Sequence, residues 1–143
     1  MRVLFVAGFG PIVRDLEASR RLYVDALGIA LDADGDYLHT EALAGVKSFA
    51  LWPLSQAAES CFGTTEWPAH LPAPHAWLEF DVDDVAAASA ELTARGYTPL
   101  VSARVEPWGQ TVTRLLSPEG ILVGVTLTPS LRGDGDHAPG EEA

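Results

Sequence analysis

The sequence has one cysteine, few basic residues and no long apolar run, and each of these shortages argues against a class of protein. Cys61 is its only cysteine, so no internal disulfide can form and a cluster of metal-binding thiolates is excluded. Only 9 Lys and Arg residues stand against 20 Asp and Glu, which disfavours nucleic acid as a partner because phosphate binding needs basic patches. No apolar run approaches the roughly 20 residues that span a bilayer, and the apolar start is too short for a signal peptide. We therefore expect a cytoplasmic protein that binds neither membrane nor nucleic acid.

The acidic excess leaves two interpretations open. The formal net charge of −11 is compatible with a cationic small-molecule ligand, because an acidic surface attracts cations. Solubility alone explains the same charge equally well. Part of it lies in residues 130–143, a polar segment rich in Gly and Pro that we expect to be a disordered acidic tail.

The two halves of the sequence predict the same order of secondary-structure elements. Residues 1–54 predict a strand at 3–10, an amphipathic helix capped by Asp15 and Gly28, and strands at 29–32, 37–40 and 48–54. Residues 75–129 predict a strand at 75–82, a helix at 83–96, and strands at 99–105, 111–116 and 121–128. Residues 55–74, rich in Pro, Ala and Ser, are interpreted as a linker.

The duplicated order predicts an α+β fold of two tandem βαβββ modules. A helix that leads into a meander of strands covers only one face of its sheet. The other face of each curved sheet is then free to line a cavity, either between the two halves or between two chains. In the first helix we expect an inward face made of Leu16, Leu22, Tyr23, Ala26 and Leu27.

Three motifs carry a family resemblance: "RDLEASRRLYVDALGI" at 14–29, "FDVDDVAAASAEL" at 80–92 and "PWGQTVTRLLSPEG" at 107–120. With the duplicated order, they make residues 3–129 resemble the vicinal oxygen chelate superfamily of glyoxalases, bleomycin resistance proteins and ring-cleaving dioxygenases. That superfamily houses both metal enzymes and metal-free drug-binding proteins on one scaffold. For a short member, the resemblance implies a homodimer with two cavities at the subunit interface.

Enzymes of this family ligate a divalent metal through His and Glu side chains, and the resemblance places the matching positions here. Gly8 lies eight residues before Leu16, Trp77 eight before Val85, and Gly124 four after Gly120. A fourth position falls near residues 51–53, Leu-Trp-Pro. None of these side chains offers a metal donor. Because the sequence departs from the pattern of the family's enzymes at these positions, we expect a protein with no metal, no cofactor and no catalytic activity.

A relocated metal site is the alternative. His75 and Glu79 share a strand face with Trp77, and His39 and Glu41 share a face in the first half, so a site of two His and one carboxylate can be drawn. We favour the reading in which the histidines lie at the surface or at loop ends.

The replacements suggest a ligand-binding cavity. Gly8, Gly10 and Gly124 would enlarge it, and His39, His75 and Glu79 would offer polar contacts. The remaining candidates are four tryptophans. We expect Trp77 to form a cavity wall, and Trp108, held between Pro107 and Gly109, to form a wall or a lid. Trp52 and Trp67 each fit the hydrophobic core as well as the cavity wall, and the sequence favours neither place. Glu106 we expect to be solvated at a strand end, and Cys61 to be an inert thiol.

The favoured function is a metal-independent binding protein that sequesters a cytotoxic natural product and so confers antibiotic self-resistance. The ligand would be a bleomycin-like glycopeptide or a planar aromatic or enediyne-type antibiotic. Two alternatives remain: a glyoxalase- or dioxygenase-type enzyme with relocated metal ligands, and an accessory protein that binds a biosynthetic intermediate.

Overall fold

The computed structural model describes residues 1–132. In the first half it contains β1 (Val3–Val13), α1 (Leu16–Arg20), the π-helical turn η1 (Arg21–Ala26), β2 (Asp32–Asp34), β3 (Tyr37–Thr40) and β4 (Phe49–Pro53). After α2 (Leu54–Phe62), the second half contains β5 (Ala76–Val82), α3 (Val85–Ala94), β6 (Val101–Val105), β7 (Thr111–Leu116), β8 (Leu122–Leu127) and the 3-10 turn η2 (Pro129–Leu131). Residues 130–131 of the predicted tail are thus folded, and 133–143 lie outside the described residues.

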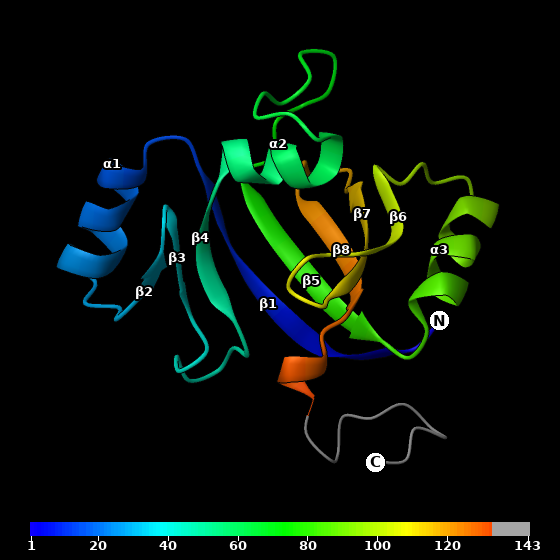
Figure 1. The fold of residues 1–143 in the computed structure, drawn as a ribbon, viewed down its shortest axis with the longest axis horizontal. Helices are drawn as coiled ribbons and strands as arrows, with labels where there is room; N and C mark the ends of the chain where they lie inside the picture. Colours follow the sequence, from blue (N-terminus) through cyan, green and yellow to red (C-terminus); the bar gives the residue numbers. More distant parts are fainter. Residues whose placement is uncertain (133–143) are drawn as a thin grey trace.

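The strands form one 8-stranded sheet in the order β2-β3-β4-β1-β5-β8-β7-β6 (Figure 1). In each half the first strand runs parallel to the last, β1 beside β4 and β5 beside β8. The two halves meet through β1 and β5, which are antiparallel neighbours at the centre of the sheet. The predicted α+β fold of two βαβββ modules is confirmed, and both modules belong to one continuous sheet.

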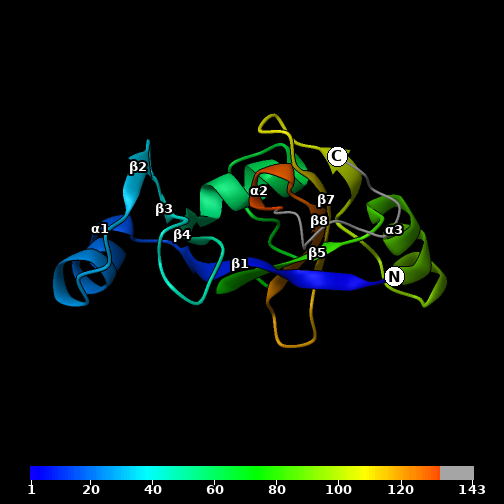
Figure 2. The same cartoon turned by 90° about the horizontal axis from the view of Figure 1, so that it is seen from below.

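The sheet is curved into a trough, and the helices occupy opposite sides of it (Figure 2). α1 and α3 flank the outside of the two curled ends, whereas α2 and η2 lie inside the trough. Each outer helix begins at an aspartate whose side chain accepts a backbone N–H, Asp15 from Ala18 at 3.1 Å and Asp84 from Ala87 at 2.9 Å. Within the described residues, no helix has the length and apolarity needed to cross a membrane.

The inward face expected for the first helix is only partly correct. Leu16 and Tyr23 pack against the core, but Leu22, Ala26 and Leu27 are exposed. Leu22 lies six residues after Leu16, about 240° around an α-helix, so it faces away from the side of Leu16 and Tyr23. For Ala26 and Leu27 the cause is the π-helical turn η1, in which the Leu27 N–H bonds to the Leu22 carbonyl, five residues back. This wider turn rotates the following side chains away from the face that an α-helical period predicts.

The segment expected to be a linker from 55 to 74 begins with a helix that the sequence reading missed. α2 buries Ala57, Ala58 and Cys61 and ends at Gly63, whose φ is +77°. Its buried face packs on Trp52 and Trp77 in the main hydrophobic cluster. α2 therefore fills one end of the trough and limits the cavity to the remainder.

Candidate functional site

A cavity of about 560 Å³ lies in the trough between α2 and η2. Its wall includes Gln56 from α2, Ser130 and Leu131 from η2, and side chains from strands of both modules. The volume is within the range of ordinary small-molecule sites. The pairing of β1 with β5 brings strands of both modules to one cavity, and the homodimer with cavities at its interface stays a prediction.

Aromatic side chains form much of the cavity wall. Trp52 and Trp77 meet edge to face with ring centroids 6.3 Å apart, and the Trp77 indole N–H donates to the Ala50 carbonyl at 3.1 Å. Tyr37 and His39 come from β3 and stack on each other at 5.2 Å, with 20° between their planes. These rigid flat surfaces suit a planar ligand.

Trp108 lies at the rim of the cavity. It is 60% exposed, and its indole N–H donates to Gln110 Oε1 at 2.9 Å. The loop turns back on itself through a bond from the Glu106 N–H to the Gln110 carbonyl at 2.7 Å, and Gly109 takes a φ of +89° that favours glycine. Trp108 thus lines the cavity with an exposed indole, and its role as a wall or lid for a ligand stays a prediction.

The back of the cavity contains a buried cation. Arg114 on β7 has a side chain only 2% exposed, and its guanidinium lies over the Trp52 ring, 5.1 Å from the centroid. It donates to Glu79 Oε2 at 3.2 Å, to Glu106 Oε1 at 3.3 Å and to Ser60 Oγ at 3.2 Å. Two carboxylates and a hydroxyl thus hold one guanidinium, as a buried charge requires.

The carboxylates of this cluster are not solvated, contrary to the expectation for Glu106. Glu106 is 6% exposed and also accepts from Arg104 at 3.0 Å. Glu79 accepts from Gln110 Nε2 at 2.8 Å with its other oxygen. Arg114 on β7 pairs with both carboxylates and Arg104 on β6 pairs with Glu106, and these opposite charges offset the cost of leaving water.

The glycines do not enlarge the cavity as expected, because neighbouring groups fill the space beside them. A Cβ at Gly8 would lie 2.8 Å from Trp77 Cη2 and 2.7 Å from the Ser48 carbonyl oxygen. At Gly10 it would overlap the Ala50 carbonyl oxygen, and at Gly124 it would lie 3.1 Å from Glu79 Cγ. Gly8 and Gly10 allow Trp77 and β4 to approach β1, and Gly124 makes room for Glu79.

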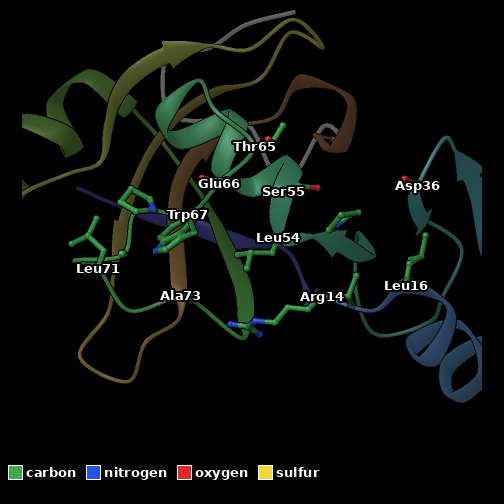
Figure 3. A pocket seen from close by; sticks show the side chains of 14 residues that line it. Arg14, Leu16, Asp36, Leu54, Ser55, Thr65, Glu66, Trp67, Leu71 and Ala73 are labelled. Carbon is green, nitrogen blue, oxygen red and sulfur yellow. The ribbon is translucent and has the colours of Figure 1, made fainter.

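Five of the ten predicted site residues line the cavity, namely His39, Trp52, Trp77, Glu79 and Trp108, whereas the three glycines, His75 and Trp67 do not. His75 is exposed just before β5, with Nδ1 3.4 Å from Arg14 Nη1. Trp67 packs edge-on against Phe62, with ring centroids 4.9 Å apart, and lines a second hollow of about 750 Å³. Figure 3 shows Trp67 and Leu54 beside this outer hollow.

The outer hollow is the larger of the two, but it is formed mainly by the 65–73 segment and the ends of β1 and β4. It lacks the buried ion pairs and the stacked aromatic wall of the inner cavity. We therefore take the inner cavity as the candidate site.

Only part of the relocated metal site lines the inner cavity, and this alternative stays a prediction. His39, Glu41 and Glu79 line the inner cavity, but His75 does not. Across residues 1–132, no three His, Cys, Asp or Glu side chains come together as a metal ion would need. Burial also raises the pKa of Cys61 to about 11, so its thiol stays protonated at neutral pH, in line with an inert cysteine.

Several cavity residues escaped the sequence reading, above all Tyr37, Gln110 and Arg114. Burial and the carboxylates of Glu79 and Glu41 raise the pKa of Tyr37 to about 12, so its hydroxyl remains a hydrogen-bond donor. Arg114 did leave a signal: a charged residue within the otherwise uncharged strand Thr111–Leu116 needs a buried partner.

Comparison with known proteins gives a consistent picture. The family model described as Glyoxalase/Bleomycin resistance protein/Dioxygenase superfamily matches residues 9–125. No curated protein matches the chain.

Solved structures similar to the chain include three from bacteria. Methylmalonyl-CoA epimerase from Mycobacterium tuberculosis is 17% identical, with a TM-score of 0.56 and coverage of 90% of this chain and 91% of that one. The Streptomyces coelicolor methylmalonyl-CoA epimerase in complex with 2-nitronate-propionyl-CoA is 15% identical, with a TM-score of 0.53 and coverage of 92% and 99%. A glyoxalase/bleomycin resistance protein/dioxygenase superfamily member from Vibrio splendidus 12B01 is 15% identical, with a TM-score of 0.53 and coverage of 82% and 94%. At this identity the likeness shows the fold alone.

Proposed function

The chain belongs to the glyoxalase/bleomycin resistance protein/dioxygenase superfamily, and from this premise we propose that it is a metal-independent protein that binds a planar, cationic small molecule. The proposed ligand is a cytotoxic natural product, which the protein sequesters and so renders harmless. The observation that carries the proposal is the inner cavity, where three tryptophans and the stacked Tyr37–His39 pair surround a space of about 560 Å³.

The charges around the cavity favour a cation. Asp34, Glu41 and Glu79 line it, against the single guanidinium of Arg114. Three carboxylates facing one positive group leave a negative potential that attracts a cationic ligand. Trp108 adds an exposed indole face at the rim, where a cation–π contact contributes about 0.5–1 kcal/mol.

Binding alone supplies enough free energy for sequestration. A ligand of about 30 heavy atoms at about −0.3 kcal/mol per atom reaches about −9 kcal/mol, which corresponds to a dissociation constant below about 1 μM. Stacking on the cavity tryptophans adds about 0.5–1.5 kcal/mol per aromatic pair.

Glu79 is the most buried acid of the cavity, and the cavity wall holds its carboxylate. It accepts from Gln110 with one oxygen and from Arg114 with the other. Its charge is thus paired within the fold, as a binding cavity requires of a partly buried carboxylate. Each oxygen keeps a second lone pair, so the test of the proposal includes an enzymatic outcome.

The test is a fluorescence titration of protein purified without chelator, combined with its metal content and the mass of the recovered ligand. The panel contains a planar cationic acridine, a bleomycin-type glycopeptide and an enediyne. We expect saturable quenching by the planar cation, an unchanged ligand mass and no stoichiometric metal.

A matched pair of variants locates the binding. Trp108→Ala should weaken binding about 10-fold, the equivalent of about 1.4 kcal/mol, because it removes one stacking partner. Trp67→Ala, which changes the outer hollow, should leave the affinity unchanged. Equal affinity of Trp108→Ala and wild type would refute the cavity assignment. One metal per chain or an altered ligand mass would favour the enzyme instead, and selective binding of a non-toxic biosynthetic intermediate would favour the accessory role.

A further inference from the structure

Glu79 and Arg114, a charged pair in the cavity wall, lie in one row of residues that crosses four strands. The ladders pair Gly8 on β1 with Glu79 on β5, Glu79 with Gly124 on β8, and Gly124 with Arg114 on β7. Residues paired in this way lie on the same face of a sheet. Glu79 thus lies between the two glycines, and Arg114 lies directly beside the second.

Gly8 and Gly124 are two of the positions at which the family resemblance implies metal ligands, and Trp77 is the third. None of these residues carries a donor, so the family's metal does not fit the side chains present. The space is occupied instead, since the Trp77 ring lies beside Gly8 and the Glu79 side chain beside Gly124.

The group that Glu79 reaches is a cation. The guanidinium of Arg114 is surrounded by Glu79 Oε2 at 3.2 Å, Glu106 Oε1 at 3.3 Å and Ser60 Oγ at 3.2 Å. Two carboxylates and a hydroxyl are oxygen donors of the kind that hard divalent cations such as Mn²⁺ prefer. The side chain of Arg114 is 2% exposed, so these oxygens face a cation that is part of the fold.

We propose that Arg114 is the built-in cation of this site and keeps the folded protein free of divalent metal. Its positive charge balances Glu79, and its bulk fills the space among the three oxygens. Arg114 then takes over the positive charge that a metal bound at positions 8, 77 and 124 would supply. A ligand entering the cavity meets a fixed guanidinium where an exchangeable metal would otherwise lie.

The test removes the guanidinium and asks whether Mn²⁺ takes its place. Arg114→Ala is titrated with Mn²⁺ alone, and free Mn²⁺ is followed by electron paramagnetic resonance. Arg114→Met, which keeps more of the buried volume, is the second variant. Both are refolded with and without Mn²⁺, and their melting temperatures are measured in each condition.

We expect wild type to bind no stoichiometric Mn²⁺ and Arg114→Ala to bind one ion per chain with a rise in melting temperature. Arg114→Met should bind Mn²⁺ more weakly than Arg114→Ala, because its side chain still fills part of the space. Adding Glu79→Gln to Arg114→Ala should weaken that binding about 10–100-fold, because a ligand is lost. A variant that folds only with Mn²⁺ also supports the proposal. It is overturned if wild type binds one Mn²⁺ per chain, or if neither variant binds Mn²⁺ or folds with it. Because the Mn²⁺ titration uses no organic ligand, its outcome is independent of the proposed binding function. Either proposal can fail while the other is supported.

Discussion

Substituting Gly8 by alanine should destabilise the protein through a single added methyl group. Gly8 lies on β1, between the Trp77 ring and the backbone of Ser48. The added Cβ would approach Trp77 Cη2 to 2.8 Å and the Ser48 carbonyl oxygen to 2.7 Å, closer than real Cβ atoms come to other heavy atoms. Neither neighbour is the end of a flexible chain, so the strands themselves must separate.

The magnitude follows from two opposing terms. Overpacking a well-packed site costs about 1–3 kcal/mol. Alanine restricts the unfolded chain more than glycine does, which returns about 0.4–1 kcal/mol. The net loss of unfolding free energy is about 1–2 kcal/mol. With a urea m-value of about 2 kcal/mol per molar, the midpoint should fall by about 0.5–1 M.

Urea unfolding followed by circular dichroism measures this shift, and Gly124→Ala is the matched control. At Gly124 the nearest atom to an added Cβ is Glu79 Cγ at 3.1 Å, a longer contact than either of the two at Gly8, so the loss should be smaller. Combining Gly8→Ala with Trp77→Phe, a shorter ring, should recover part of the loss in a double-mutant cycle. If Gly8→Ala unfolds at the wild-type midpoint, or costs no more than Gly124→Ala, the close packing of Trp77 on Gly8 is wrong.

Two further predictions concern buried polar groups. Asp81→Ala should lower the unfolding free energy by about 3 kcal/mol, because the fully buried Asp81 carboxylate accepts from Arg132 at 3.0 Å and from the Thr128 N–H at 2.9 Å. Calorimetry measures this loss, with Asp36→Ala at an exposed position as the control. Equal stability of the two variants would contradict the prediction. Cys61, with its pKa raised to about 11, should be alkylated by iodoacetamide far more slowly in folded than in urea-unfolded protein at pH 8; equal rates would show that the thiol is accessible.

Local chemistry made much of the fold predictable. The strands at 37–40 and 111–116 have the observed bounds, and Asp15 caps its helix as expected. Alternating side chains, turn residues and capping groups act within a few positions of one another, so the sequence displays them directly. The duplicated order of elements predicted the two βαβββ modules, whereas the order of the strands across one continuous sheet was not predicted.

The cavity was less predictable because its contacts are long-range. α2 is buried on one face only because the trough covers it, and its Ala-rich, Ser-rich sequence gives a weak signal by itself. The pairing of Glu79 with Arg114 depends on the register of β5, β8 and β7. The sequence predicts empty space beside Gly8 and Gly10, because the position of the Trp77 ring is not visible in it.

The duplicated fold explains why the cavity has two unlike walls. β3 and β7 hold corresponding places in the two modules, each as the middle strand of the three that follow the helix. β3 contributes the stacked Tyr37 and His39, whereas β7 contributes Arg114 and is preceded by Gln110 and the Trp108 loop. Equivalent strands have therefore diverged into an aromatic wall and a charged wall. A flat ligand between them meets different chemistry on its two sides, so the site can select one orientation, which a symmetric pair of modules could not.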